Sequence, residues 1–408
     1  MSDWYYLQGS QRLGPHTLEQ MRALSARGLI GPQTKVWTAG FADWKDAATA
    51  PDVLSAAPEA PPTDAGPSWD TVSRVSDALS GVTGTDRIDS SHLTDLFSEV
   101  LKRHDETELE RVFASGLTAT TPALSQLDVR TPSPWVYSRL LGFFGIAFVI
   151  LYIAWIEFEG SDRLIPGLIL IGSFASPLAA AVFVYECNIP RNVSLFIFAR
   201  LFTWGGVIAI LLTFALFPLV SAMAAVIGPS IAGLVEEPGK LAAVVLLANA
   251  ARFRWTLNGM CLGAAVGAGF AAFESAGYAL ESLAEHGGEG LIHSLAIRGL
   301  LAPFGHVVWT AICAGALWRV RQGKPFDWAM LRDRRCLSPI VSAMVLHALW
   351  NSPLPAMLPL YLGYFAIGAV GWIIAIGMMH EAIREIRDAK DSAERTIDAG
   401  IMHAGGGA

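Results

Sequence analysis

Long apolar runs dominate residues 135–379 of this chain. Only 26 of these 245 residues are charged, 14 Lys or Arg and 12 Asp or Glu, and uncharged runs long enough to cross a bilayer recur. About 20 residues of helix span the hydrocarbon core, because each residue adds about 1.5 Å to a core about 30 Å thick. The sequence therefore predicts an all-α polytopic membrane protein in a lipid bilayer.

The charges of the loops predict how eight apolar segments cross the bilayer. Loops after the second, fourth and sixth segments carry arginines, whereas the opposite loops are mostly acidic. Arg-rich loops stay in the cytoplasm, so about eight transmembrane helices with both termini cytoplasmic are expected. The segments cover about residues 138–157, 164–186, 196–217, 222–249, 257–281, 293–318, 337–353 and 356–379.

The first third of the chain is more polar. Residues 1–134 carry 11 Lys or Arg and 18 Asp or Glu, and the start, Met1-Ser2-Asp3, lacks the basic and apolar regions of a signal peptide. We therefore expect this part to stay in the cytoplasm. The whole chain has a net charge of −7 and no basic stripe, which excludes nucleic acid as a partner.

Four parts are predicted along the chain. Residues 1–55 form a small cytoplasmic α+β module rich in aromatic side chains. Residues 56–134 hold a Pro-rich linker, Pro58 to Pro67, followed by short amphipathic helices. Residues 135–380 form the membrane domain, and residues 381–408 form a cytoplasmic tail.

Several motifs of residues 1–55 fall in a recognisable pattern. They are Trp4-Tyr5-Tyr6, Gly14-Pro15, Gly28-Leu29-Ile30, Val36-Trp37 and Trp44. The pattern resembles the GYF-like domain often found at the cytoplasmic end of bacterial membrane proteins, and the resemblance implies a peptide ligand. The same aromatic side chains would also fill the core of a very small domain, so both roles stay open.

Ionisable residues interrupt four of the predicted membrane segments. Such residues are costly inside a bilayer and are therefore functional candidates. Counted from the outer ends of their segments, they lie in the outer half of the bilayer or near its midplane, so one shared polar cavity is expected. They are Glu236, Glu237 and Lys240 in the fourth segment, Glu274 in the fifth, Arg298 and His306 in the sixth, and His347 and Asn351 in the seventh.

The spacing of these residues suggests hydrolysis of an amide bond. Glu236 and Glu237 precede Lys240 by one helical turn, so the lysine can neutralise one of the carboxylates. His347 and Asn351 share one helix face and offer hydrogen-bond donors. A carboxylate that activates water, opposite donors for the oxyanion, performs this chemistry, and no cofactor is expected.

Four strings on successive segments carry a second resemblance. They are GLVEEPGK, GFAAFESAGY, GHVVWTAICAGAL and HALWNS. These strings resemble the EExxK, FxxxE, His and HxxxD/N motifs of the PrsW proteases, intramembrane enzymes related to the CAAX-processing and Abi families. The resemblance spans about residues 200–380 and implies a peptidase of the bacterial inner membrane. Its implied substrate is a membrane-anchored protein cut near the outer face, such as an anti-sigma factor.

The resemblance also implies site roles. Glu236 would be the base that activates water, and further catalytic roles fall on Glu237, Glu274, His306 and His347, with Asn351 as a donor and with Lys240 and Arg298 in support. Two positions depart from the relatives. CAAX-type relatives have a histidine where this chain has Glu274, and some PrsW members have Asp where this chain has Asn351.

Different mechanisms and functions stay open. In a zinc-dependent version of the peptidase, Glu236, Glu274, His306 and His347 would be the ligands. The absence of HExxH and the cation of Lys240 count against it. A proton-coupled transporter and a non-catalytic membrane scaffold stay open as well, although the lack of a repeated motif counts against the transporter.

Purely structural roles stay open for several residues. Glu236 or Glu237 can be an ion-pair partner of Lys240, Glu274 can bond His306 without chemistry, and Arg298 can extend toward the membrane surface. A small-residue face, Gly263, Gly267 and Gly269, is expected to pack helices together.

Overall fold

The computed structural model describes residues 4–8, 11–26, 30–54, 69–88, 90–117 and 119–405. The predicted Pro-rich linker, Pro58 to Pro67, and the predicted motif residues Gly28 and Leu29 lie outside the described residues. The chain divides into two compact units, Met1–Ser68 and Trp69–Ala408, which are considered separately.

The first unit is built on a small antiparallel sheet with strand order β2-β1-β3-β4. One side of the sheet and the short helices enclose a core that includes Tyr6, Met21, Ile30, Val36 and Val53. The α+β character predicted for this part is therefore confirmed. The elements are β1 (Trp4–Gln8), β2 (Gln11–His16), α1 (Leu18–Ala26), β3 (Lys35–Thr38), β4 (Lys45–Asp46) and α2 (Pro51–Leu54).

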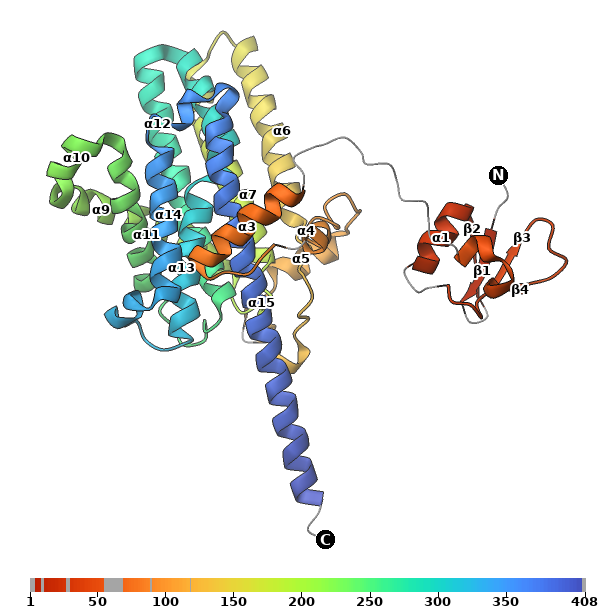
Figure 1. Cartoon of the computed structure of the whole chain (residues 1–408). Coiled ribbons are helices and arrows are strands. Elements are labelled where there is room, and N and C mark those ends of the chain that lie inside the picture. Colours follow the sequence, from red (N-terminus) through yellow and green to blue (C-terminus); the bar gives the residue numbers. More distant parts are fainter. Residues whose placement is uncertain are drawn as a thin grey trace. The chain divides into compact units, whose positions relative to one another are not determined.

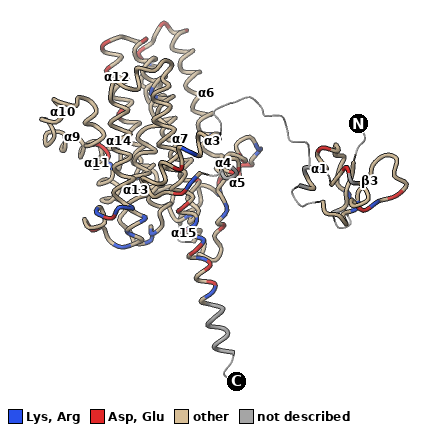
Figure 2. The backbone as a smooth tube through the Cα atoms, viewed as in Figure 1, with Lys and Arg blue, Asp and Glu red and all other residues tan. Residues whose placement is uncertain are grey.

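The second unit is a bundle of long helices with short helices at its periphery (Figure 1). Most of the bundle is uncharged, and Lys and Arg gather at one end, where α13 and α14 are joined (Figure 2); we call this the basic end. Its helices are α3 (Trp69–Thr83), α4 (Ser90–Leu96), α5 (Glu106–Phe113), α6 (Val136–Glu157), α7 (Ile165–Glu186), α8 (Leu195–Arg200), α9 (Gly206–Leu216), α10 (Ser221–Ile227), α11 (Ala232–Ala248), α12 (Thr256–Leu301), α13 (His306–Arg321), α14 (Arg334–Trp350) and α15 (Leu362–Gly405).

Five stretches of the described helices are long and apolar enough to cross a membrane. They are Val136–Glu157, Asp162–Glu186, Leu195–Ala248, Thr256–Arg321 and Pro359–Thr396. The chain is thus a multi-pass membrane protein, but the predicted count of about eight transmembrane helices is not confirmed by this measure.

Three of the five stretches exceed the length of one crossing: Leu195–Ala248, Thr256–Arg321 and Pro359–Thr396. Thr256–Arg321 has 66 residues, whereas about 20 suffice. Within it, Gly259 contacts Trp318 and Gly267 contacts His306, so the two ends run antiparallel. The helix leaves α-geometry at Gly287, where φ is 66° and glycine has no steric penalty. The stretch therefore folds back on itself.

The predicted sixth segment, 293–318, is interrupted. A short 3₁₀ turn at Ala302–Phe304 and the non-helical backbone of Gly305 separate α12 from α13. Pro303 cannot donate a backbone hydrogen bond, which explains why the helix ends here. As a result His306 begins a helix instead of lying in the middle of one.

Residues 82–87 bind the helices of the bundle, and helix α3 before them was not anticipated from the sequence. The carbonyl of Val82 accepts from Ser338 Oγ at 2.5 Å, and the carbonyl of Gly84 accepts from Arg319. Asp86 forms an ion pair with Arg384. These contacts fix the segment to α13, α14 and α15.

Candidate functional site

The structure brings the predicted polar residues of α11, α12, α13 and α14 into one buried cluster. We call it the polar cluster; it comprises Glu236, Glu237, Lys240, Glu274, Arg298, His306 and His347. His306 opens α13 and His347 lies in the last turn of α14. Both positions are at the ends of their helices that point away from the basic end, so the cluster lies on that side of the bundle.

Two close helix approaches position the cluster. A Cβ atom on Gly267 would lie 2.4 Å from the carbonyl oxygen of His306, and one on Gly233 would lie 2.5 Å from the backbone of Met344 and Ala348. Only glycine permits these distances. Gly263 likewise faces the backbone of α13, and Gly269 faces the carbonyl of Phe202. The expected packing role of the small-residue face is confirmed, and this packing brings both histidines toward α11.

Glu237 is fully engaged by side chains around it. One carboxylate oxygen accepts from Lys240 Nζ at 2.8 Å and lies 2.9 Å from His347 Nδ1. The other accepts from Thr310 Oγ1 at 3.1 Å. A carboxylate beside Nδ1 favours a proton on that nitrogen and leaves Nε2 of His347 with its lone pair free.

Glu274 contacts one ring nitrogen of His306, as Glu237 does for His347. Its Oε2 lies 3.0 Å from His306 Nε2 and also accepts from Arg298 at 2.5 Å. Ser275 accepts a further hydrogen bond from Arg298 Nε. A proton on Nε2 leaves Nδ1 of His306 as an acceptor. Arg298 therefore supports the cluster instead of merely extending toward the membrane surface.

Lys240 lies between the two carboxylates of its own helix and His306. Its Nζ is 3.2 Å from Glu236 Oε2, 2.8 Å from Glu237 Oε1 and 2.7 Å from His306 Nδ1, and it lies over the ring of Phe270. An ammonium has three donors, and these three acceptors match them. The lysine pairs with both carboxylates, whereas the sequence predicted only one.

Nε2 of His347 and Nδ1 of His306, the latter already in contact with Lys240 Nζ, converge on Glu236. His347 Nε2 lies 3.6 Å and His306 Nδ1 lies 3.8 Å from Glu236 Oε2, and one ligand atom from each of the three residues lies within 4.8 Å of the others. Ligands of a tetrahedral zinc lie about 3.3 Å apart, as follows from bond lengths of about 2.0–2.1 Å. Two imidazoles and one carboxylate are a ligand set that fits a catalytic metal. The second nitrogen of each imidazole contacts a further carboxylate, as is usual for histidine ligands. Glu274, expected as a ligand in the zinc version, instead holds His306.

A cavity of about 340 Å³ adjoins this convergence point. His306 and Trp309 of α13 form one side of it, Arg298 lies on a second side, and Asn351 at the end of α14 lines it as well. Trp309 stacks on the ring of His347 at 4.4 Å. The cavity therefore reaches His306 directly, whereas the ring of His347 lies behind Trp309; Asn351 also lines the same space.

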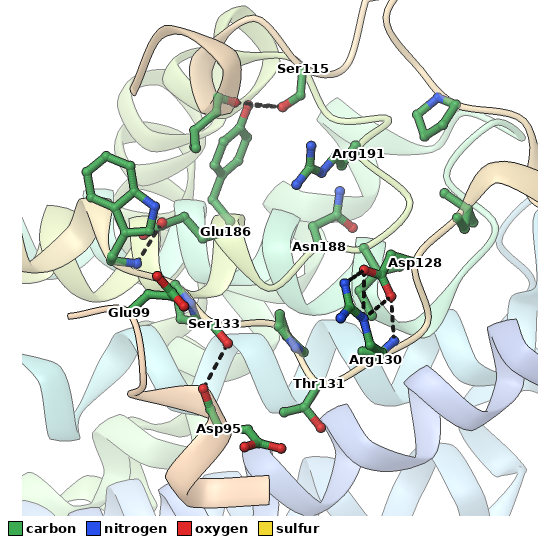
Figure 3. A pocket seen from close by; sticks show the side chains of 18 of the residues that line it. Asp95, Glu99, Ser115, Asp128, Arg130, Thr131, Ser133, Glu186, Asn188 and Arg191 are labelled. Carbon is green, nitrogen blue, oxygen red and sulfur yellow. Dashed lines mark hydrogen bonds and ion pairs between the residues drawn. The ribbon is translucent and has the colours of Figure 1, made fainter. Parts of the chain in front are cut away.

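A larger cavity, about 890 Å³, lies elsewhere and contains none of the polar cluster (Figure 3). Asp128 and Arg130 bond each other on its wall, and hydrogen bonds from Arg130 lower the pKa of Asp128. Glu186, also on the wall, accepts the backbone N–H groups that begin α6, each at 2.9 Å. These polar groups are engaged with one another, so the smaller cavity is the better candidate for chemistry.

The sequence did not reveal every residue of the site. Thr310 and Ser275 bond the cluster, and Tyr361 and Tyr364 line the cavity. Thr310 follows His306 by one helical turn, which places both on one face and was a usable signal. Tyr361 lies in a region of irregular backbone and Tyr364 in the first turn of α15, and no spacing rule connects them with the cluster.

Two family comparisons match the chain. Residues 194–379, which include the whole polar cluster, match the family described as PrsW family intramembrane metalloprotease. Residues 4–52 match GYF domain 2. No curated protein and no solved structure matches the chain.

Proposed function

Since the chain belongs to the PrsW family of intramembrane proteases and carries a GYF-like domain before it, we propose that the polar cluster hydrolyses a peptide bond of a membrane-anchored protein. The observation that supports this proposal is the convergence of Glu236, His306 and His347 beside a cavity. A membrane-anchored anti-sigma factor is one substrate that the resemblance suggests.

We further propose that Glu236, His306 and His347 hold a divalent metal such as zinc. When bound, the metal would acidify a water molecule and polarise the scissile carbonyl. The remaining residues prepare the site for this chemistry. Glu237 and Glu274 fix the proton of each imidazole on the side away from the convergence point. The amide of Asn351 is placed to donate to the developing oxyanion from the wall of the cavity.

A second candidate is the metal-free mechanism with Glu236 as the general base. The position of Lys240 favours it, because a cation already lies 2.7 Å from His306 and 3.2 Å from Glu236. In this version Glu236 accepts a proton from water and Asn351 donates to the oxyanion. The histidine donors expected from the sequence would require imidazolium rings, because the protons of the neutral rings face Glu237 and Glu274. The expected absence of a cofactor applies only to this candidate.

One experiment separates the two mechanisms. The full chain is reconstituted in proteoliposomes with a panel of single-pass membrane proteins, and cleavage is measured with and without a zinc chelator. Glu236→Gln is compared with Glu281→Gln, since Glu281 is exposed on α12 outside the cluster. Loss of cleavage in Glu236→Gln alone supports the peptidase. Chelator-sensitive cleavage, restored by zinc, together with about one zinc per chain, supports the metal; chelator-resistant cleavage supports the glutamate base.

The direction of the chain in the membrane is also a proposal. Eight crossings, with both termini in the cytoplasm of a bacterium, would place the basic end inside, as the positive-inside rule requires. The polar cluster would then lie toward the outer face of the inner membrane. Labelling of single cysteines introduced at residues 160 and 323 tests this. A membrane-impermeant thiol reagent added outside should label residue 160 and not residue 323.

The first unit offers a surface for a peptide. Tyr5 and Trp37 contact each other at 5.9 Å and are only partly buried, and Arg12 lies over the ring of Tyr5. Rings exposed in this way suit extended Pro-rich segments. We propose such a peptide as its ligand, and binding of a Pro-rich peptide library by residues 1–68, lost in Trp37→Ala, would test it.

A further inference from the structure

Three aromatic side chains form one wall of the 340 Å³ cavity. We call them the aromatic wall: Trp350 at the end of α14, Tyr361, and Tyr364 at the start of α15. Their rings form a row in space. The ring centroids of Trp350 and Tyr364 are 4.9 Å apart, and those of Tyr364 and Tyr361 are 6.2 Å apart. Trp309 joins the wall to the site, since it lies 5.5 Å from Trp350 and 4.4 Å from His347.

The charged side chains that line the cavity are already engaged by other residues. Arg298 donates to Glu274 and to Ser275, so its guanidinium is engaged by groups of the cluster. His306 is engaged by Glu274 and Lys240. The aromatic wall, together with Ile297 and Leu301, therefore offers a substrate side chain apolar contact.

The volume of the cavity limits how a substrate enters. A helix about 10 Å across has a cross-section of about 80 Å², so 340 Å³ would hold about 4 Å of it, less than one turn. Only a short segment of a transmembrane helix about 30 Å long can therefore occupy it. An extended segment with one large side chain fits this space.

Unusual backbone geometry holds the outer part of the wall. Leu360 and Tyr361 have φ values of 54° and 59°, which are unfavourable for bulky residues. Gly363 packs so closely on Pro355 that a Cβ atom would lie 2.4 Å from its carbonyl oxygen. Packing therefore maintains a conformation that Leu360 and Tyr361 would otherwise avoid, as is common where a protein holds a ligand.

We propose that the aromatic wall is the subsite that receives a bulky apolar side chain of the substrate next to the scissile bond. The inference rests on the proposed peptidase function and adds its residue preference. Trp350, Tyr361 and Tyr364 determine this specificity. Removing one ring of such a pocket should reduce discrimination between large and small side chains by about tenfold or more.

The test uses the full chain in proteoliposomes with a pool of single-pass model proteins. Each has the same transmembrane helix, and the residues at its outer end are randomised. Mass spectrometry identifies the cleaved bonds. We expect Leu, Met or Phe beside the bond in the wild type, loss of that preference by about tenfold in Tyr364→Ala, and its retention in Tyr364→Phe.

The matched control is Tyr152→Ala, because Tyr152 lies on α6 and packs in a separate cluster with Trp155. Glu236→Gln reports on the proposed function by itself. Cleavage that depends on Glu236 but shows the same residue preference in the wild type and Tyr364→Ala overturns the subsite alone. No Glu236-dependent cleavage in the pool overturns the proposed function and the subsite together. Equal loss of preference in Tyr152→Ala also overturns the subsite, since the effect would then be general.

Discussion

The close approach of α12 and α13 makes Gly267→Ala an informative substitution. The new Cβ atom would lie 2.4 Å from the carbonyl oxygen of His306, whereas ordinary contact begins at 3.4 Å, so the backbones must separate by about 1.0 Å. The atom in the way is backbone, and no side-chain rotation can relieve it. Overpacking of this kind lowers the free energy of unfolding by about 1–3 kcal/mol. The higher helix propensity of alanine offsets about 1 kcal/mol of this loss.

We expect Gly267→Ala to reduce the cleavage rate by a larger factor than it reduces the equilibrium constant for folding. His306 moves with its backbone, and a displacement of about 1 Å at a catalytic group can reduce the rate about a hundredfold. Zinc affinity should fall as well, because one of the three converging side chains moves away from the other two. The measurements are the cleavage rate in proteoliposomes, the zinc dissociation constant and the midpoint of thermal unfolding.

The same helix supplies the matched control. A Cβ atom on Gly277 would meet nothing within 4 Å, so Gly277→Ala makes the same chemical change on α12 in open space. It should leave the cleavage rate and zinc affinity unchanged. If Gly267→Ala kept a rate within about twofold of Gly277→Ala, the conclusion that glycine sets the position of His306 would be refuted.

Three further predictions concern other parts of the site and its supports. Glu237→Gln should lower zinc affinity about 10- to 100-fold, measured by competition with a chromogenic chelator, since the carboxylate that holds His347 is lost; unchanged affinity would contradict this role. Gly233→Ala should reduce cleavage because its Cβ would lie 2.5 Å from the backbone of α14, and a rate equal to that of Gly277→Ala would contradict it. The hydrogen bond from the Arg335 side chain lowers the pKa of Asp333, so this residue stabilises the fold above about pH 4 and the contribution is lost as the pH falls through the lowered pKa. Asp333→Asn keeps an N-cap for α14. It should make the difference between the thermal unfolding midpoints at about pH 6 and about pH 3 smaller than in the wild type. If that difference stays the same, other groups cause it.

The residues of the polar cluster could be predicted because ionisable groups stand out in apolar segments. Their roles could not be separated in the same way. Glu236 and Glu237 are neighbours in the sequence, and neighbouring residues of a helix point about 100° apart. Only the packing of α13 and α14 decides which carboxylate contacts Nδ1 of His347 and which one faces Nε2 of His347 and Nδ1 of His306. The same limit applies to Glu274, whose partner depends on where α13 begins.

The apolar segments were predictable, but their limits were not. Hydropathy does not register Gly287, where α12 bends, or the break at Ala302–Phe304, because neither changes the apolar composition. Helix α3 was missed since its residues are mixed in character and it is held by partners distant in sequence, such as Ser338 with Val82. Contacts of this kind depend on the tertiary fold and leave no local pattern.

Charge balance explains how Lys240 can share the site with a metal. At their ordinary charges, Glu236, Glu237 and Glu274 contribute three negative charges, and Lys240 and Arg298 contribute two positive ones, so the cluster keeps one uncompensated negative charge. Buried charge without a partner is strongly unfavourable in a membrane domain. A divalent cation between Glu236 and the two histidines would change the net charge of the cluster from −1 to +1, an imbalance of the same size. Lys240 would need to give up only its contacts with Glu236 and His306, because Glu237 remains its partner at 2.8 Å. The lysine is therefore best understood as the cation that stabilises the carboxylates whenever the metal is absent.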